Sequence, residues 1–174
     1  GGDADMKGHV NLKGEDYNLT ASTRHLPLNA FVPGLATTPL TATIEAKGHR
    51  FNPLEKGSTL HAKANIRSLR YDVYPLDNTR LVADVQSGQA NVKFNMQNRM
   101  MQGDGLVQAD LNDFGKPGSE MACFADACID EFNPRAIGLM EDTLTVGATF
   151  RATLRASSDF KRISSQGSLA DICF

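Results

Sequence analysis

The sequence contains no tryptophan, only three cysteines and few aromatic residues, which make up 7% of its 174 residues. Three cysteines do not make a disulfide scaffold in a chain of this length. No run of about 18 apolar residues is present, so no segment is predicted to span a membrane. Lysine and arginine number 18, aspartate and glutamate number 20, and the net charge is −2. Because these charges are spread without blocks, we expect no nucleic-acid partner.

Motifs of catalysis and of metal binding are also missing. No histidine pair has the H-x-x-x-H or H-E-x-x-H spacing, and no cysteine–histidine set has zinc spacing. The chain has no Walker-type loop, no G-x-G-x-x-G and no serine within G-x-S-x-G. We therefore expect a protein that is not an enzyme, with no catalytic residue, cofactor or metal. The histidines, interpreted as surface or turn residues, are His9, His25, His49 and His61.

The strongest pattern present is an alternation of apolar and polar residues with a period of two. It places the apolar side chains of a strand on one face and is typical of antiparallel sheet with one face in water. Turn signals at 14–16, 77–78, 87–88 and 103–105 separate the segments. The sequence predicts an all-β, mainly antiparallel meander of roughly eight strands. The alternating segments are 6–12, 17–23, 40–47, 60–67, 81–85, 90–97, 107–111 and 146–156, and a last strand is expected at 169–174.

Two stretches interrupt the alternation. In 26–39, Pro27 is expected to open a single helical turn that Pro33 and Gly34 close. In 115–141, apolar residues recur at i, i+3, i+4, i+7, i+8 and i+11, which predicts one short amphipathic helix. Ser119 is its expected N-cap and Pro134 its expected stop. We expect one β-rich domain over 1–174 with a helical insertion at 115–141, whose apolar stripe is Met121, Phe124, Ala125, Cys128, Ile129 and Phe132.

The three cysteines leave two pairing schemes open. On such a helix, Cys123 and Cys128 lie about 140° apart around the axis and do not pair with each other. One scheme has a bridge from Cys173 to either of them. The other, which we favour, has three separate thiols.

Alanine is unusually frequent on the apolar side of the predicted strands, and two architectures fit this. In a β-sandwich, larger residues fill the space that the alanines leave. In a single curved sheet, the apolar face lines an elongated groove that 115–141 or 26–39 partly covers, and an exposed apolar surface of that size usually marks a binding site. The candidates for lining this groove are Ile44, Leu60, Ile66, Val85, Val92, Phe94, Val146, Phe150 and Leu154.

Several segments resemble the TamB/AsmA-like family, a group related to the bridge-like lipid transport proteins. Segment 26–35, with the letters LPLNAFVPGL, precedes the alternating segment 40–48, which ends in glycine. In that family, a turn with the pattern L-P-L…F-x-P precedes such a strand. Segments 69–78 and 138–146 are similar to the family too, and the likeness covers 5–111 and 137–174. The cysteine-bearing stretch 115–132 departs from the family pattern.

The resemblance implies a non-catalytic periplasmic segment of a longer cell-envelope protein that is anchored at the inner membrane. It implies a β-sheet trough whose apolar groove binds or conducts lipid acyl chains, and a role in lipid transport, protein secretion and outer-membrane assembly. The implied partners are an outer-membrane barrel or neighbouring segments of the same protein. The alternative is a β-sandwich structural or interaction module that pairs through its edge strands with envelope partners.

Overall fold

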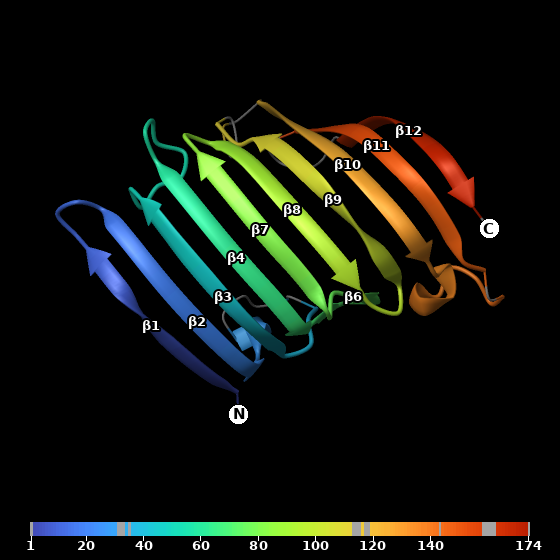
Figure 1. Ribbon diagram of the computed structural model, residues 1–174, viewed down its shortest axis with the longest axis horizontal. Coiled ribbons are helices and arrows are strands. Elements are labelled where there is room, and N and C mark those ends of the chain that lie inside the picture. Colours follow the sequence, from blue (N-terminus) through green and yellow to red (C-terminus); the bar gives the residue numbers. More distant parts are fainter. Residues whose placement is uncertain are drawn as a thin grey trace.

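The computed structural model describes residues 2–30, 34, 36–112, 116, 119–142, 144–157 and 163–173. These residues form a ten-stranded antiparallel sheet and a small two-stranded one (Figure 1). The order of the large sheet is β1-β2-β3-β4-β7-β8-β9-β10-β11-β12, so its strands pair in chain order, with the β5–β6 hairpin inserted between β4 and β7. The predicted all-β antiparallel meander is confirmed, with ten strands in place of eight.

The strands follow the alternating segments of the sequence closely. The large sheet consists of β1 Asp3–Asn11, β2 Asp16–Leu26, β3 Leu40–His49, β4 Thr59–Ser68, β7 Thr79–Gln86, β8 Gln89–Gln97, β9 Met101–Asp110, β10 Glu120–Phe132, β11 Val146–Ser157 and β12 Ile163–Cys173. The small sheet consists of β5 Arg70–Tyr71 and β6 Tyr74–Pro75. Two 3-10 turns, η1 Leu28–Ala30 and η2 Pro134–Ile137, complete the described elements.

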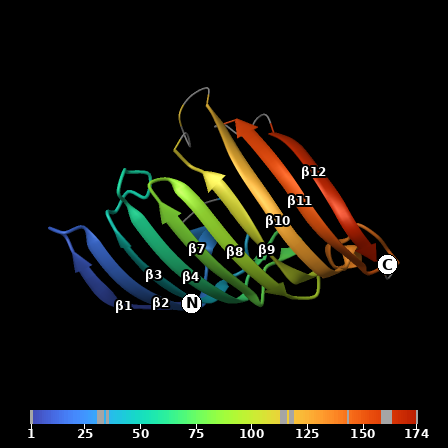
Figure 2. The same cartoon turned by 45° about the horizontal axis from the view of Figure 1, so that its top comes forward.

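The large sheet is a single twisted layer. Figure 2 shows no second large sheet packed on either face, and the small β5–β6 sheet lies behind the lower part of the large one (Figure 1). Within the described part of the chain, the architecture is therefore the single sheet and not the β-sandwich. Apart from the β5–β6 hairpin at one end, no described strands form an opposing layer on either face of the large sheet.

The predicted helix within 115–141 is wrong. Residues 120–132 form β10, which pairs with β9 on one side and with β11 on the other. The segment fits both the helical period of 3.6 and the strand period of two. Met121, Ala125 and Ile129 belong to the helical stripe and also to an alternating strand pattern. Hydrogen bonding to a strand on each side decides between them, since tertiary context overrides weak local propensity.

Among the described residues of the predicted insertion, helical structure is limited to the turn η2. Pro134 opens this turn and does not end a helix before it. Asn133 caps it, because its side chain accepts a hydrogen bond from the Arg135 backbone N–H at 3.1 Å. The turn predicted after Pro27 is confirmed as η1, with Gly34 at a φ of 84°. Pro33 lies outside the described residues.

Turns follow the predicted signals at 14–16, 77–78 and 87–88. Ser87 and Gly88 both have positive φ, 50° and 83°, as a two-residue hairpin turn of type I′ requires. The turn predicted at 103–105 is wrong, because Gly103 and Gly105 lie inside β9. Glycine is used there for close packing, since a Cβ on Gly105 would lie 2.7 Å from the Phe94 ring and from the Asp126 carbonyl oxygen.

The sheet buries few large side chains. Among the described residues, the only side chain less than 2% exposed is that of Ser58, and the most buried apolar residues are the alanines Ala42 and Ala152. The accessible surface is 11337 Å². A compact monomer of 18.8 kDa has about 8300 Å². The excess of about 3000 Å² is consistent with a sheet whose apolar side has no second layer.

Candidate functional site

Strand pairing aligns the apolar residues into rows that cross the sheet. Because directly paired residues point to the same face, each row is a line of neighbouring side chains. One row is Met6, Ala21, Ile44, Ala64, Leu81, Phe94, Gly105, Ala127, Phe150 and Leu169. The next is Gly8, Leu19, Ala46, Ala62, Ala83, Val92, Val107, Ala125, Ala152 and Gly167.

Two further rows flank these on the same face. One is Ala4, Thr23, Ala42, Ile66, Thr79, Met96, Gly103, Ile129 and Ala148. The other is Val10, Tyr17, Gly48, Leu60, Val85, Ala90, Ala109, Cys123, Leu154 and Ser165. We call the surface made by the four rows the apolar face.

The apolar face carries no charged side chain in any of its four rows. Its threonine hydroxyls bond to the backbone: the Thr23 hydroxyl donates to Leu40 O at 3.3 Å, and the Thr79 hydroxyl donates to Asp77 O at 3.3 Å. These groups offer little hydrogen bonding to a ligand. The face therefore offers mainly non-directional apolar contact, which the hydrophobic effect favours with any apolar occupant.

All nine groove candidates from the sequence lie on this face. Eight of them belong to the four rows. The ninth, Val146, pairs with Phe132 beyond a β-bulge in β10 and precedes Ala148 by two residues on the same strand. Val85 is buried, at 9% exposure, and the other eight side chains are half-buried. Sequence alternation was sufficient to place these residues on one face.

No protein-family model, curated protein or solved structure matches this chain. The resemblance to the TamB/AsmA-like family therefore stays a prediction. Among the described residues, no helical segment has the length and hydropathy that a membrane span needs. Nor does that part of the chain bring together three or more His, Cys, Asp or Glu side chains that could hold a metal ion.

The cysteines lie on different faces and are all free. Cys123 is in a row of the apolar face, and Cys128, five residues along the same strand, points to the opposite face. The expectation that these two do not pair holds, although the reason is strand alternation and not helix geometry. Burial raises the pKa of the Cys123 thiol. Cys128 and Cys173 are exposed.

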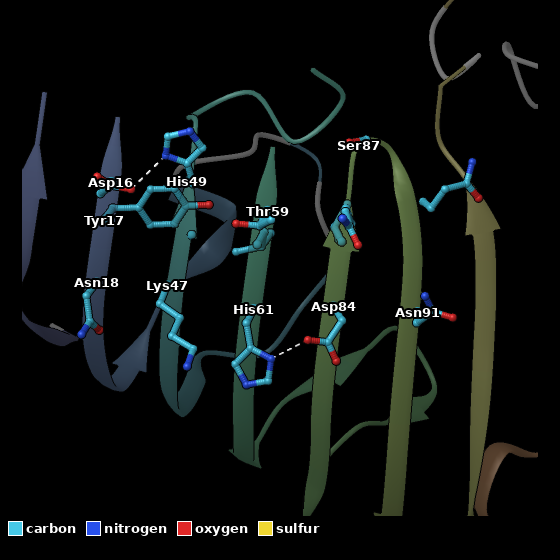
Figure 3. Close-up of a pocket in the computed structure, with 15 residues that line it drawn as sticks. Asp16, Tyr17, Asn18, Lys47, His49, Thr59, His61, Asp84, Ser87 and Asn91 are labelled. Carbon is cyan, nitrogen blue, oxygen red and sulfur yellow. Dashed lines mark hydrogen bonds and ion pairs between the residues drawn. The ribbon is translucent and has the colours of Figure 1, made fainter. Parts of the chain in front are cut away.

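The opposite face, which we call the polar face, contains a feature that sequence reasoning missed. A hollow of about 910 Å³ lies over β2, β3, β4, β7 and β8. Two histidine–aspartate pairs line it: His61 Nδ1 lies 2.6 Å from Asp84 Oδ1, and His49 Nδ1 lies 2.9 Å from Asp16 Oδ1 (Figure 3). Each pair joins adjacent strands. No sequence spacing reveals them, because their partners are 23 and 33 residues apart.

Proposed function

We propose that the apolar face binds lipid acyl chains and that the chain acts as a non-catalytic segment of a TamB/AsmA-like protein of the cell envelope. The observation that carries this proposal is the set of four uncharged rows on a sheet with no second layer. A water-exposed apolar surface of this extent usually marks a binding site. In this proposal, the lipid supplies the missing layer.

The chemistry of the face favours acyl chains over a folded protein partner. Protein interfaces usually contain a polar rim, hydrogen bonds and aromatic or arginine anchors at the centre. The four rows contain three aromatic residues, Tyr17, Phe94 and Phe150, and no arginine. Methylene groups need only apolar area, and each one buried contributes about 0.8 kcal/mol. Alternation of large and small residues, such as Ile44 beside Ala64, gives a corrugated surface along which such a chain fits.

The dimensions of the sheet also suit a lipid. Ten strands have nine spacings of about 4.8 Å, so the rows run for roughly 43 Å across the sheet. Because all four rows are uninterrupted by charge, an acyl chain can shift along a row without crossing a charged side chain. The proposal therefore includes conduction of lipid as well as binding. The periplasmic location and the role in outer-membrane assembly rest on the family resemblance.

Introducing an aspartate on the apolar face, with the same substitution on the polar face as a control, tests this function. We expect Ile44→Asp and Phe94→Asp to abolish saturable uptake of a fluorescent fatty acid, because each places a carboxylate among the apolar rows. Thr43→Asp and Asn95→Asp are matched controls, since these residues adjoin the first two on the same strands and face the other way. Circular dichroism would verify that the sheet persists in all four variants. Equal uptake by both sets, or no uptake by the folded wild type, would contradict the proposal.

A specific observation on β12 supports a second role, pairing through the edge of the sheet. Residues 164–173 are exposed, and charge and an irregular register occur only near the C-terminal end of β12, at Asp171, while the stretch 164–170 contains no charged residue. Natural sheets usually protect an open edge with charge, proline or a bulge. The opposite edge, β1, has Asp3, Asp5 and Lys7. We propose that β12 accepts an extended strand from a neighbouring envelope segment or partner.

Sedimentation velocity over a range of concentrations tests this role with a second copy of the chain as the strand donor. We expect concentration-dependent association that Ser168→Lys removes, because lysine on an edge strand opposes strand addition. Thr153→Lys is the control, since Thr153 lies on the same face of the neighbouring strand β11, which already has two partners. A monomer at every concentration would count against self-pairing at this edge.

A further inference from the structure

The hollow on the polar face is built from two rows of hydrogen-bonding side chains. One row is Asn18, Lys47, His61, Asp84 and Asn91, and the other is Asp16, His49, Thr59, Gln86 and Gln89. Both rows cross the same five strands, which have four spacings of about 4.8 Å and span roughly 19 Å. Figure 3 shows the labelled members of these rows in front of the strands. The hollow is thus an extended, open groove and not an enclosed pocket.

Some of its side chains are fixed by cross-strand bonds. The two histidine–aspartate pairs occupy Asp16 and Asp84, and the Gln108 side-chain amide donates to Asn91 Oδ1 at 2.7 Å. These bonds join β2 to β3, β4 to β7 and β8 to β9. They orient planar groups in the groove before any ligand arrives, which lowers the entropic cost of binding.

Other side chains in the groove have no such partner. Asn18, Thr59 and Gln86 make no side-chain hydrogen bond with any described residue, and Lys47 makes no ion pair with one. Amides and hydroxyls both donate and accept hydrogen bonds. The groove therefore presents a mixed set of free donors and acceptors beside the fixed pairs.

We propose that this groove binds a neutral saccharide chain. Its ionisable groups are two carboxylates, one ammonium and two histidines, so the net charge is −1 with the histidines neutral and +1 with both protonated. A near-neutral groove does not favour a polyanion such as nucleic acid, whose binding needs many cations. It also lacks the several free carboxylates that a hard metal ion requires, because both of its aspartates are paired.

The chemistry of a saccharide matches these groups in detail. Each sugar hydroxyl donates and accepts, and two adjacent hydroxyls can bond to both atoms of one amide, so free Asn and Gln side chains suit them. The paired aspartates keep acceptor capacity beyond the single histidine bond. An extended chain of sugar rings fits an open groove that runs across five strands. This site is on the opposite face from the lipid-binding surface and does not depend on it.

The test is a titration of the whole chain, followed by the amide signals of its NMR spectrum, with three neutral hexasaccharides: maltohexaose, cellohexaose and chitohexaose. We expect saturable shifts for at least one of them, with a Kd of about 1 mM or tighter, confined to β2, β3, β4, β7 and β8. The double variant Asn18→Ala/Gln86→Ala should weaken binding by about tenfold or more, because it removes two hydrogen-bonding groups.

The matched control is Gln97→Ala/Gln166→Ala, which removes two amides from the polar face outside the groove. Binding should be unchanged in this control, and fatty-acid uptake should be unchanged in both double variants. Absence of saturable shifts with all three saccharides would overturn the proposal, as would equal binding by the two double variants.

Discussion

At the residue scale, glycine and alanine decide how close the side chains of the apolar face lie. Gly105 is directly paired with Phe94 on one side and with Ala127 on the other. The Phe94 ring extends over Gly105, which is why a Cβ there would meet ring carbons at 2.7 Å. In the same way, the Tyr17 ring lies across Gly48 on the neighbouring part of the sheet. Small residues therefore let aromatic rings lie flat on a face that has no second layer to hold them.

Substitution of Gly105 tests this packing. We expect Gly105→Ala to lower the free energy of unfolding by about 1–3 kcal/mol, because the new methyl group displaces the Phe94 ring and presses on the Asp126 carbonyl. Urea denaturation would measure the change. The loss of unfolding free energy caused by Gly105→Ala should be smaller in a Phe94→Leu background, because the effects of substitutions at contacting residues are not additive. A neutral effect of Gly105→Ala in the wild type would contradict the described packing.

Cys123 and Cys128 are natural probes of the two faces. The pKa of the Cys123 thiol is raised by burial, so at a given pH less of it is thiolate, the form that reacts. We expect iodoacetamide to modify Cys128 and Cys173 before Cys123, as mass spectrometry of the peptides would show. A bound fatty acid should slow the reaction of Cys123 and leave Cys128 unchanged. Protection of Cys128 by the fatty acid would place the ligand on the wrong face.

At the element scale, strands with a simple period of two were predictable from sequence, and β10 was not. Phe124 and Cys128 are apolar residues that point to the polar face, and together with Met121, Ala125, Ile129 and Phe132 they form a stripe that predicts a helix. The sequence also does not reveal the register of the sheet, that is, which residues of adjacent strands lie opposite each other. Whether His61 lies opposite Asp84 depends on how β4 pairs with β7, which no local pattern determines. The polar groove was missed for this reason.

The tight turn between β7 and β8 carries an element-scale prediction. Gly88 has a φ of 83°, where a Cβ is strained, and a Cβ there would also meet the Asn112 side chain. We expect Gly88→Ala to lower the free energy of unfolding by about 1–2 kcal/mol in urea denaturation. Gln86→Ala, two residues earlier in the strand, should change it by less than about 0.5 kcal/mol. Equal effects of the two substitutions would mean that the backbone at Gly88 is not strained.

At the scale of the whole molecule, composition left the number of layers open. Rows rich in alanine fit a sandwich with large residues opposite them as well as a single sheet, because local alternation does not say what faces a strand. Pairing of each strand of the large sheet with the preceding and following strands of that sheet gives one layer, in which β1 and β12 are the outermost described strands. We propose separate roles for the two faces: lipid binding for the apolar face and saccharide binding for the polar face.

Methyl NMR with a spin-labelled fatty acid tests the central claim most directly, because it reports which face the chain touches. Val92 and Val82 can be compared within one spectrum, because Val92 lies on the apolar face and Val82, which pairs with Lys93, lies on the polar face. We predict strong broadening of the methyl signals of Ile44, Val92 and Leu154, with those of Val82 and Thr153 unaffected. Equal broadening on both faces, or broadening centred on Val82, would contradict a lipid-binding apolar face.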